Sequence, residues 1–123
     1  VTIIGEYAFR GCTSLTSITI PNGVTSIDRQ AFSKCTGLTS ITLPEGLTVI
    51  EYATFSGCSN LPSITIPDSV TEIGGSAFSN CSKLTSITFG GTVEQWNAIT
   101  KGSSWNNNVP ATKVVCSDGE VAL

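Results

Sequence analysis

The chain has 123 residues, of which 12% are charged and 40% hydrophobic, and its formal net charge is −3. This length predicts one domain, and six lysines and arginines placed singly do not form the clustered basic face that would bind nucleic acid. No apolar run approaches the roughly 18 residues of a membrane-spanning helix, so we expect no membrane insertion in this segment.

A repeat of constant length organises most of the sequence. Four copies start at residues 1, 24, 47 and 70, and apolar residues recur at seven positions in each copy. A constant period of this length indicates a stack of similar rungs, that is, a repeat solenoid. The seven columns are Val1, Val24, Leu47 and Val70; Ile4, Ile27, Ile50 and Ile73; Phe9, Phe32, Phe55 and Phe78; Cys12, Cys35, Cys58 and Cys81; Leu15, Leu38, Leu61 and Leu84; Ile18, Ile41, Ile64 and Ile87; and Ile20, Leu43, Ile66 and Phe89.

The second copy illustrates the elements that each rung predicts. Residues 24–27 suggest a short extended piece, and the apolar spacing of three and four within residues 28–35 favours a turn or two of α- or 3₁₀-helix. Residues 38–43 end in strict alternation, which predicts a strand with one buried face. Pro44 ends this strand because it lacks an N–H group. Stacked rungs would therefore pair their strands into one parallel sheet.

The repeat fades after Thr92. Val93 and Trp96 still fall on the first two apolar columns, each one full period beyond the preceding copy, whereas residues 102–110 form a polar loop. An open solenoid end exposes its apolar columns and needs a cover. We expect Trp96 and Trp105 to supply it, so we assign residues 1–91 to four repeats and residues 92–123 to a C-terminal capping segment.

The end of the capping segment predicts a β-hairpin. Residues 114–116 and 121–123 are short apolar stretches, and Asp118-Gly119 between them is a common turn pair. The opposite end offers no comparable cover, since the chain lacks methionine and begins at Val1 within a repeat. We therefore expect the N-terminal part of the native protein to be absent, and the bare end to give weak end-to-end self-association.

The repeat resembles that of BspA-type bacterial surface proteins, whose leucine-rich repeat has the same length. The tail segments 91–96 and 115–119 resemble the C-terminal cap common in that family, while Thr54 and Gly90 depart from the family's alanine and proline. The resemblance implies a right-handed leucine-rich-repeat superhelix with a parallel sheet on one face. It also implies a secreted or surface-attached bacterial protein, for which adhesion is often proposed. The matching residues are Ile27, Ala31, Phe32, Cys35, Leu38, Ile41, Leu43 and Pro44.

The row of cysteines is the first chemically suggestive feature. Four thiols in a line do not converge as the tetrahedral ligands of zinc do, and there is no CxxC pair and no histidine to complete a site. Adjacent rungs approach disulfide distance, but the side chains would have to leave the core. We favour buried free thiols over a disulfide or a metal site, and expect no cofactor.

The hydroxyl side chains of the strands are the candidate binding residues. They alternate with the buried isoleucines and therefore project away from the core. Two interpretations stay open: a ligand surface, or threonines that serve only the strands, for which they have a high propensity. An ice-binding array is a weaker alternative, because a curved face would not match the ice lattice. A sugar site is also weaker, because Tyr7 and Tyr52 lie at different repeat positions and form no aromatic stripe. The candidates are Ser17, Thr19, Ser40, Thr42, Ser63, Thr65, Ser86 and Thr88.

Enzymatic activity is not expected from this sequence. The absence of histidine excludes a Ser-His-Asp triad, and neither a glycine-rich phosphate loop nor a recurring carboxylate pair is present. The sequence thus predicts a non-catalytic module, and the family resemblance implies that it is an extracellular or cell-surface recognition module of bacterial type. Its partner would be a surface or matrix protein or a glycan, of host or bacterial origin. The alternative function is a structural stalk or spacer that presents other domains.

Overall fold

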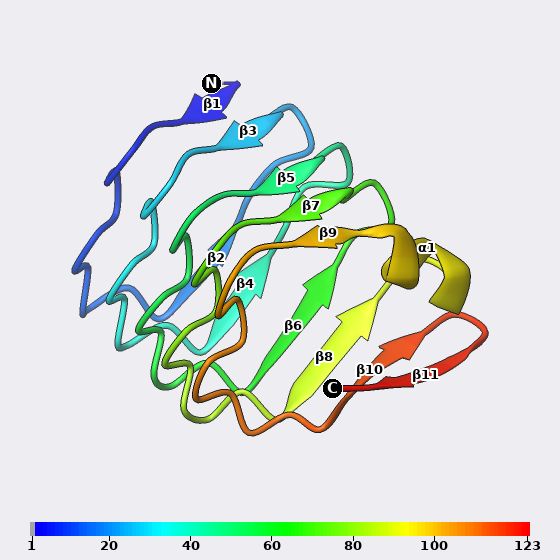
Figure 1. The fold of residues 1–123 in the computed structure, drawn as a ribbon. Coiled ribbons are helices and arrows are strands. Elements are labelled where there is room, and N and C mark those ends of the chain that lie inside the picture. Colours follow the sequence, from blue (N-terminus) through cyan, green and yellow to red (C-terminus); the bar gives the residue numbers. More distant parts are fainter. Residues whose placement is uncertain (1) are drawn as a thin grey trace.

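The computed structural model describes residues 2–123 and confirms the predicted repeat solenoid (Figure 1). Val1, assigned to the first apolar column, lies outside the described residues. The strands form two rows along the stack. One row contains β1 (Ile3–Ile4), β3 (Ser26–Ile27), β5 (Val49–Ile50), β7 (Glu72–Ile73) and β9 (Thr100–Lys101); the other contains β2 (Ser17–Thr19), β4 (Ser40–Thr42), β6 (Ser63–Ile66), β8 (Ser86–Phe89) and β10 (Lys113–Cys116), with β11 (Gly119–Ala122) at its end.

Where the strands of neighbouring repeats pair, they run parallel, and each residue lies opposite its equivalent in the next copy. Ser17 lies opposite Ser40 in β2 and β4, and Ile64 lies opposite Ile87 in β6 and β8. The short extended piece predicted at residues 24–27 is present as β3 and has equivalents in the other repeats, so it forms a strand row of its own.

A continuous phenylalanine stack fills the core. Phe9, Phe32, Phe55 and Phe78 lie with ring centroids 5.2, 5.6 and 5.4 Å apart and ring planes within 8° of parallel. The last three rings are completely buried. The predicted core register is therefore confirmed, and each ring has an equivalent ring above or below it in the stack.

Residues 28–35 form consecutive tight turns instead of a continuous helix. Gln30 and Lys34 adopt positive φ angles of 57° and 59°, which interrupt the right-handed helical path that the apolar spacing predicted. This backbone lets alternate N–H groups reach the next rung: the Phe32 amide donates to the Thr54 carbonyl at 3.0 Å. The turns thus provide a third row of hydrogen bonds between rungs, which an α-helix would have used internally.

The capping segment contains a short helix, α1 (Val93–Ala98), that the sequence analysis did not predict. Trp96 is buried as expected, but the assignment of Val93 and Trp96 to the strand columns is wrong, because β9 continues that row and pairs Lys101 with Ile73. The helix inserts extra residues before the chain rejoins the stack. Its sequence signal is the capping box of Thr92 and Gln95.

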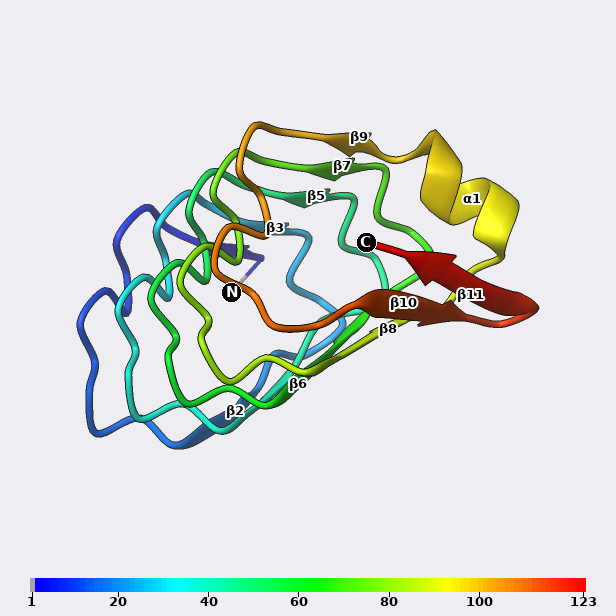
Figure 2. The same ribbon diagram turned by 60° about the horizontal axis from the view of Figure 1, so that its bottom comes forward.

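The predicted hairpin is confirmed and extends the second strand row. β10 pairs in parallel with β8 and antiparallel with β11, so the hairpin lies beside the last rung, with α1 close to it in the same end of the molecule (Figure 2). Trp105 packs edge-on against Phe78 at 6.3 Å and against Trp96 at 5.8 Å. The two tryptophans therefore close the phenylalanine stack.

Replacing Thr92 with alanine is expected to lower the free energy of unfolding by about 1 kcal/mol. The Thr92 hydroxyl accepts a hydrogen bond from the Gln95 amide at 3.1 Å, and the substitution leaves that N–H group without its cap. Urea unfolding followed by circular dichroism measures the change. Thr112→Ala, at an exposed position beside β10, is the matched control; equal stability of the two variants would contradict a role for the cap.

Candidate functional site

The hydroxyl side chains predicted as binding residues form two aligned files on the second strand row. Serine lies opposite serine and threonine opposite threonine in each ladder, as in the pairs Thr19–Thr42 and Thr65–Thr88. Seven of the eight residues are exposed, and Thr88 is half-buried. Within residues 2–123 their hydroxyl groups form no hydrogen bond to the protein. These groups are therefore free to bind water or a ligand.

The threonines that immediately precede β4 and β8 have a different, structural role. The hydroxyl groups of Thr39 and Thr85 donate to the main-chain carbonyls of Thr16 and Pro62 in the preceding rungs, at 3.0 and 3.4 Å. The amides of the same two threonines donate to the same carbonyls. This double contact begins the ladder between adjacent strands.

Pro62 interrupts the strand row between the second and third rungs. It occupies the position of Thr39 and Thr85 but has no N–H group, so the first hydrogen bond of the ladder cannot form. In the described part of the chain, β2 and β4 accordingly form one sheet, while β6, β8, β10 and β11 form another. The expectation of one parallel sheet along this row is therefore wrong, because the proline divides the row into two sheets.

The break extends to the first strand row, where β3 and β5 are not paired. The turn row stays continuous, because the amides of Gln30 and Lys34 donate to the carbonyls of Tyr52 and Ser56. The second and third rungs are thus hydrogen-bonded at the turns, whereas their strands lie side by side without ladder hydrogen bonds.

A groove of about 600 Å³ lies at the carboxyl ends of β4 and β6. Its walls combine apolar side chains of the two rungs with two carboxylates, and its lining contains no lysine or arginine. Thr42 and Thr65 belong both to the hydroxyl files and to this groove. The lining residues are Ile41, Thr42, Leu43, Glu45, Thr65, Pro67, Asp68 and Gly90.

The row of cysteines lies within the hydrophobic core. The thiols of Cys35, Cys58 and Cys81 are free and fully buried. Each donates a hydrogen bond to the phenylalanine carbonyl of the preceding rung, at 3.0 to 3.2 Å. Desolvation raises the pKa of all three thiols, that of Cys81 to about 12, so they stay protonated donors at neutral pH. Among residues 2–123 no cluster suited to a metal ion is found.

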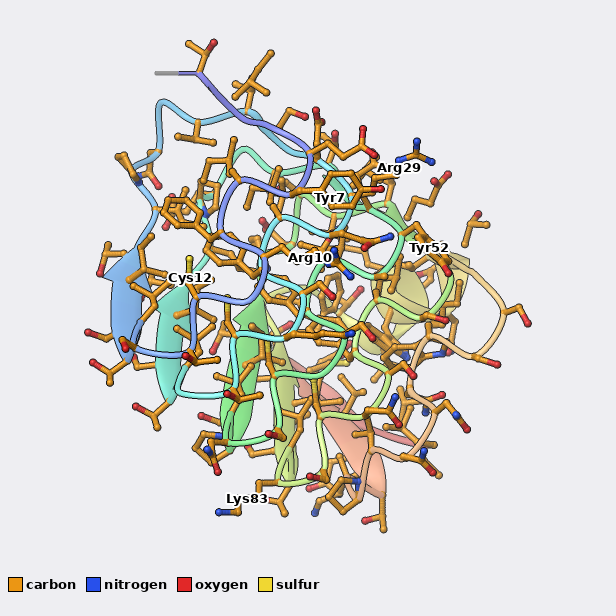
Figure 3. The ribbon with its side chains drawn as sticks, turned by 90° about the vertical axis from the view of Figure 1, so that its left-hand side faces the viewer. Tyr7, Arg10, Cys12, Arg29, Tyr52 and Lys83 are labelled. Atoms are coloured by element: carbon orange, nitrogen blue, oxygen red, sulfur yellow. The ribbon has the colours of Figure 1, made fainter. Side chains whose placement is uncertain are left out.

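The exposed tyrosines lie on the edge formed by the turns, away from the hydroxyl files. Tyr7 and Tyr52 are each about half exposed, at 48% and 51%, and Figure 3 shows them on the same edge with Arg10 and Arg29. The Arg10 guanidinium lies 5.7 Å from the centre of the Tyr7 ring. Since Arg10 covers that ring, the edge does not offer two open aromatic faces for a sugar.

The comparisons with known proteins agree on one family. The description "BspA type Leucine rich repeat region" belongs to the family model that matches residues 1–104, in six copies. No curated protein matches the sequence. In residues 2–123, no helix has the length and apolar character needed to cross a membrane.

Three solved structures have similar folds. A leucine-rich repeat protein of T. pallidum is 32% identical over 93% of this chain and 51% of that protein, with a TM-score of 0.82. A leucine-rich cell surface protein of Faecalibacterium prausnitzii is 31% identical over 81% and 32% of the two chains, with a TM-score of 0.74. A leucine-rich repeat protein of Bacteroides capillosus is 39% identical over 74% and 64%, with a TM-score of 0.66. The chain therefore spans between 32 and 64% of the length of these proteins.

Proposed function

This chain belongs to the BspA-type leucine-rich repeat family, and we propose that it is a non-catalytic recognition module, secreted or attached to a bacterial cell surface. In this proposal the module binds a surface or matrix protein or a glycan through its hydroxyl files. The observation that carries the proposal is the alignment of eight hydroxyl groups with no hydrogen bond inside the described part of the protein. The proposal divides the module into four repeats over residues 1–91 and a capping segment over residues 92–123.

The cell-surface location is supported by the Faecalibacterium prausnitzii relative, whose name places that protein at the cell surface. A non-catalytic role is supported by the family itself, since the matched relatives are leucine-rich repeat proteins. The files consist of neutral hydroxyl groups, which recognise a partner by hydrogen bonds rather than by long-range charge attraction.

A structural stalk is the second candidate function. It is favoured by the stacked phenylalanine rings and by the turn row, whose hydrogen bonds join every adjacent pair of rungs. Such a stack resists bending at its turn side and would hold another domain at a fixed distance. A stalk needs no ligand on its strand face, which separates it from the recognition module by experiment.

Replacing Thr42 and Thr65 together with lysine is expected to abolish binding to the partner while leaving the fold intact. Both side chains point to solvent, and two long charged side chains would block the hydroxyl files. Arrays of host and bacterial matrix proteins and glycans, probed with the wild-type chain and this variant, measure the effect. Thr13→Lys/Thr48→Lys, at exposed positions outside the hydroxyl files, is the control. A stalk predicts no array signal at all, and equal signals from both variants would contradict recognition through the files.

A further inference from the structure

We propose that the groove between β4 and β6 binds an extended peptide segment of a partner protein that carries a basic side chain. This inference rests on the proposed function and deepens it, because it assigns the partner class and places the contact within the hydroxyl files. The groove lies between two rungs whose strands are not paired in this row, and we attribute that break to the missing N–H group of Pro62.

Unpaired main-chain groups line the groove. In the intact pair of rungs, the Ile20 amide donates to the Thr42 carbonyl at 3.0 Å. The equivalent groups across the break are the Leu43 amide and the Thr65 carbonyl, and no such bond joins them in the described residues. An N–H donor and a C=O acceptor thus face the same space. An extended peptide presents the complementary pair, since each of its residues carries one donor and one acceptor.

The walls match alternating side chains. In an extended segment, successive side chains point to opposite sides. Those turned inward would meet Ile41, Leu43 and Pro67, which form the apolar part of the groove and favour a β-branched or other aliphatic residue. Those turned outward would lie beside the hydroxyl groups of Thr42 and Thr65.

The charge of the groove determines the polar requirement of the peptide. Glu45 and Asp68 are both exposed at its rim. Because the lining contains no positive side chain, a lysine or arginine of the peptide can form a charge-assisted hydrogen bond to either carboxylate. A glycan offers neither the main-chain donor-acceptor pair nor the positive charge, so the groove favours a protein partner.

The probe for this site is the peptide acetyl-Thr-Val-Lys-Val-Thr-amide, titrated into the full isotope-labelled chain and followed by NMR. We expect saturable shifts at the amides of Leu43, Thr65 and Asp68. Glu45→Gln/Asp68→Asn should weaken binding about tenfold or more, and Glu51→Gln/Glu72→Gln, which removes two carboxylates near the other strand row, should leave it unchanged. A second peptide with proline in place of both valines lacks the two main-chain donors at those positions and should not bind.

Pro62→Thr tests the origin of the groove. Threonine restores the N–H group that begins the ladder in the other rungs, so β4 and β6 should pair and occupy the Leu43 amide and the Thr65 carbonyl themselves. We expect this variant to fold, to be at least as stable as the wild type, and to lose peptide affinity by about tenfold or more. Unchanged affinity in this variant, or peptide shifts confined to other strands, would overturn the proposal.

The outcomes also separate this proposal from the proposed function. If the peptide fails to shift Leu43 and Thr65 while array binding still depends on Thr42 and Thr65, the peptide groove is wrong and surface recognition stands. If the peptide fails and the arrays give no signal, both are wrong. Peptide binding that is lost in Pro62→Thr supports both.

Discussion

Replacing Phe55 with alanine is expected to lower the free energy of unfolding by about 3 to 5 kcal/mol. The Phe55 ring is completely buried and stacks on Phe32 at 5.6 Å and on Phe78 at 5.4 Å. Removing it leaves a cavity between two rings that the rungs on either side hold in place. The rungs cannot collapse into the cavity without breaking the hydrogen bonds of the turn row, so the cost should lie near the upper end of that range.

Phe9→Ala provides the matched control for this prediction. Phe9 stacks on Phe32 alone and is only half-buried, so the same substitution there removes one ring contact instead of two. Urea unfolding of both variants, monitored by tryptophan fluorescence, gives the two free energies. A loss at Phe55 no larger than that at Phe9 would contradict a continuous stack as the main source of core stability.

The regular part of this fold could be predicted from the sequence because a single repeat length determines the position of every apolar column in it. The phenylalanine, cysteine and isoleucine columns all recur at the same interval, and a stack is the arrangement that brings equal positions together. The turns at residues 28–35 could not be distinguished from a helix by the apolar pattern, since a spacing of three or four fits both a helix and a series of turns. The positive φ angles of Gln30 and Lys34 decide between them. Glycine occupies the Lys34 position in the first and third copies, as Gly11 and Gly57, both with positive φ, and this was the available sequence signal.

One part of the candidate site could likewise be predicted from the sequence, and another part could not. The outward direction of the serine and threonine side chains follows from alternation along a strand, and it could be predicted from the sequence. The groove depends on a departure from the repeat, namely proline at position 62 where the other copies have threonine. A missing N–H group leaves little trace in a pattern of apolar residues, although a column-by-column comparison of hydrogen-bond donors would have revealed it. The helix α1 was missed for a similar reason, because its signal is a capping pair and not an apolar period.

The buried thiols connect the core to a measurable dependence on pH. Cys35, Cys58 and Cys81 each donate to a carbonyl of the rung before, so the protonated thiol is the form that the folded state needs. Ionisation would place a negative charge in the core opposite that carbonyl oxygen. Burial therefore raises the pKa of each thiol in the folded state, to about 12 for Cys81.

We expect the free energy of unfolding to fall as the pH rises from about 9 to 12. Unfolded thiols ionise near a pH of about 8.5, whereas the folded thiols retain their protons up to a higher pH, so raising the pH favours the unfolded chain. A deeply buried thiol such as Cys81 contributes a loss of about 1.4 kcal/mol per pH unit within this window, and its full stabilisation is present below about pH 8.5. Urea unfolding in a reducing buffer at several pH values measures the slope.

Cys81→Ala isolates the thiol from the other groups that titrate in this range. Lys101, for example, has a pKa lowered by desolvation and contributes a dependence of the opposite sign, but it is present in both proteins. The variant loses a constant amount of packing energy at every pH and one ionisable group. Its stability should therefore decline less steeply than that of the wild type, by about one proton between about pH 9 and 12. Parallel curves would mean that Cys81 ionises equally easily in the folded and unfolded states, which is incompatible with a thiol buried in the core and donating to the Phe55 carbonyl.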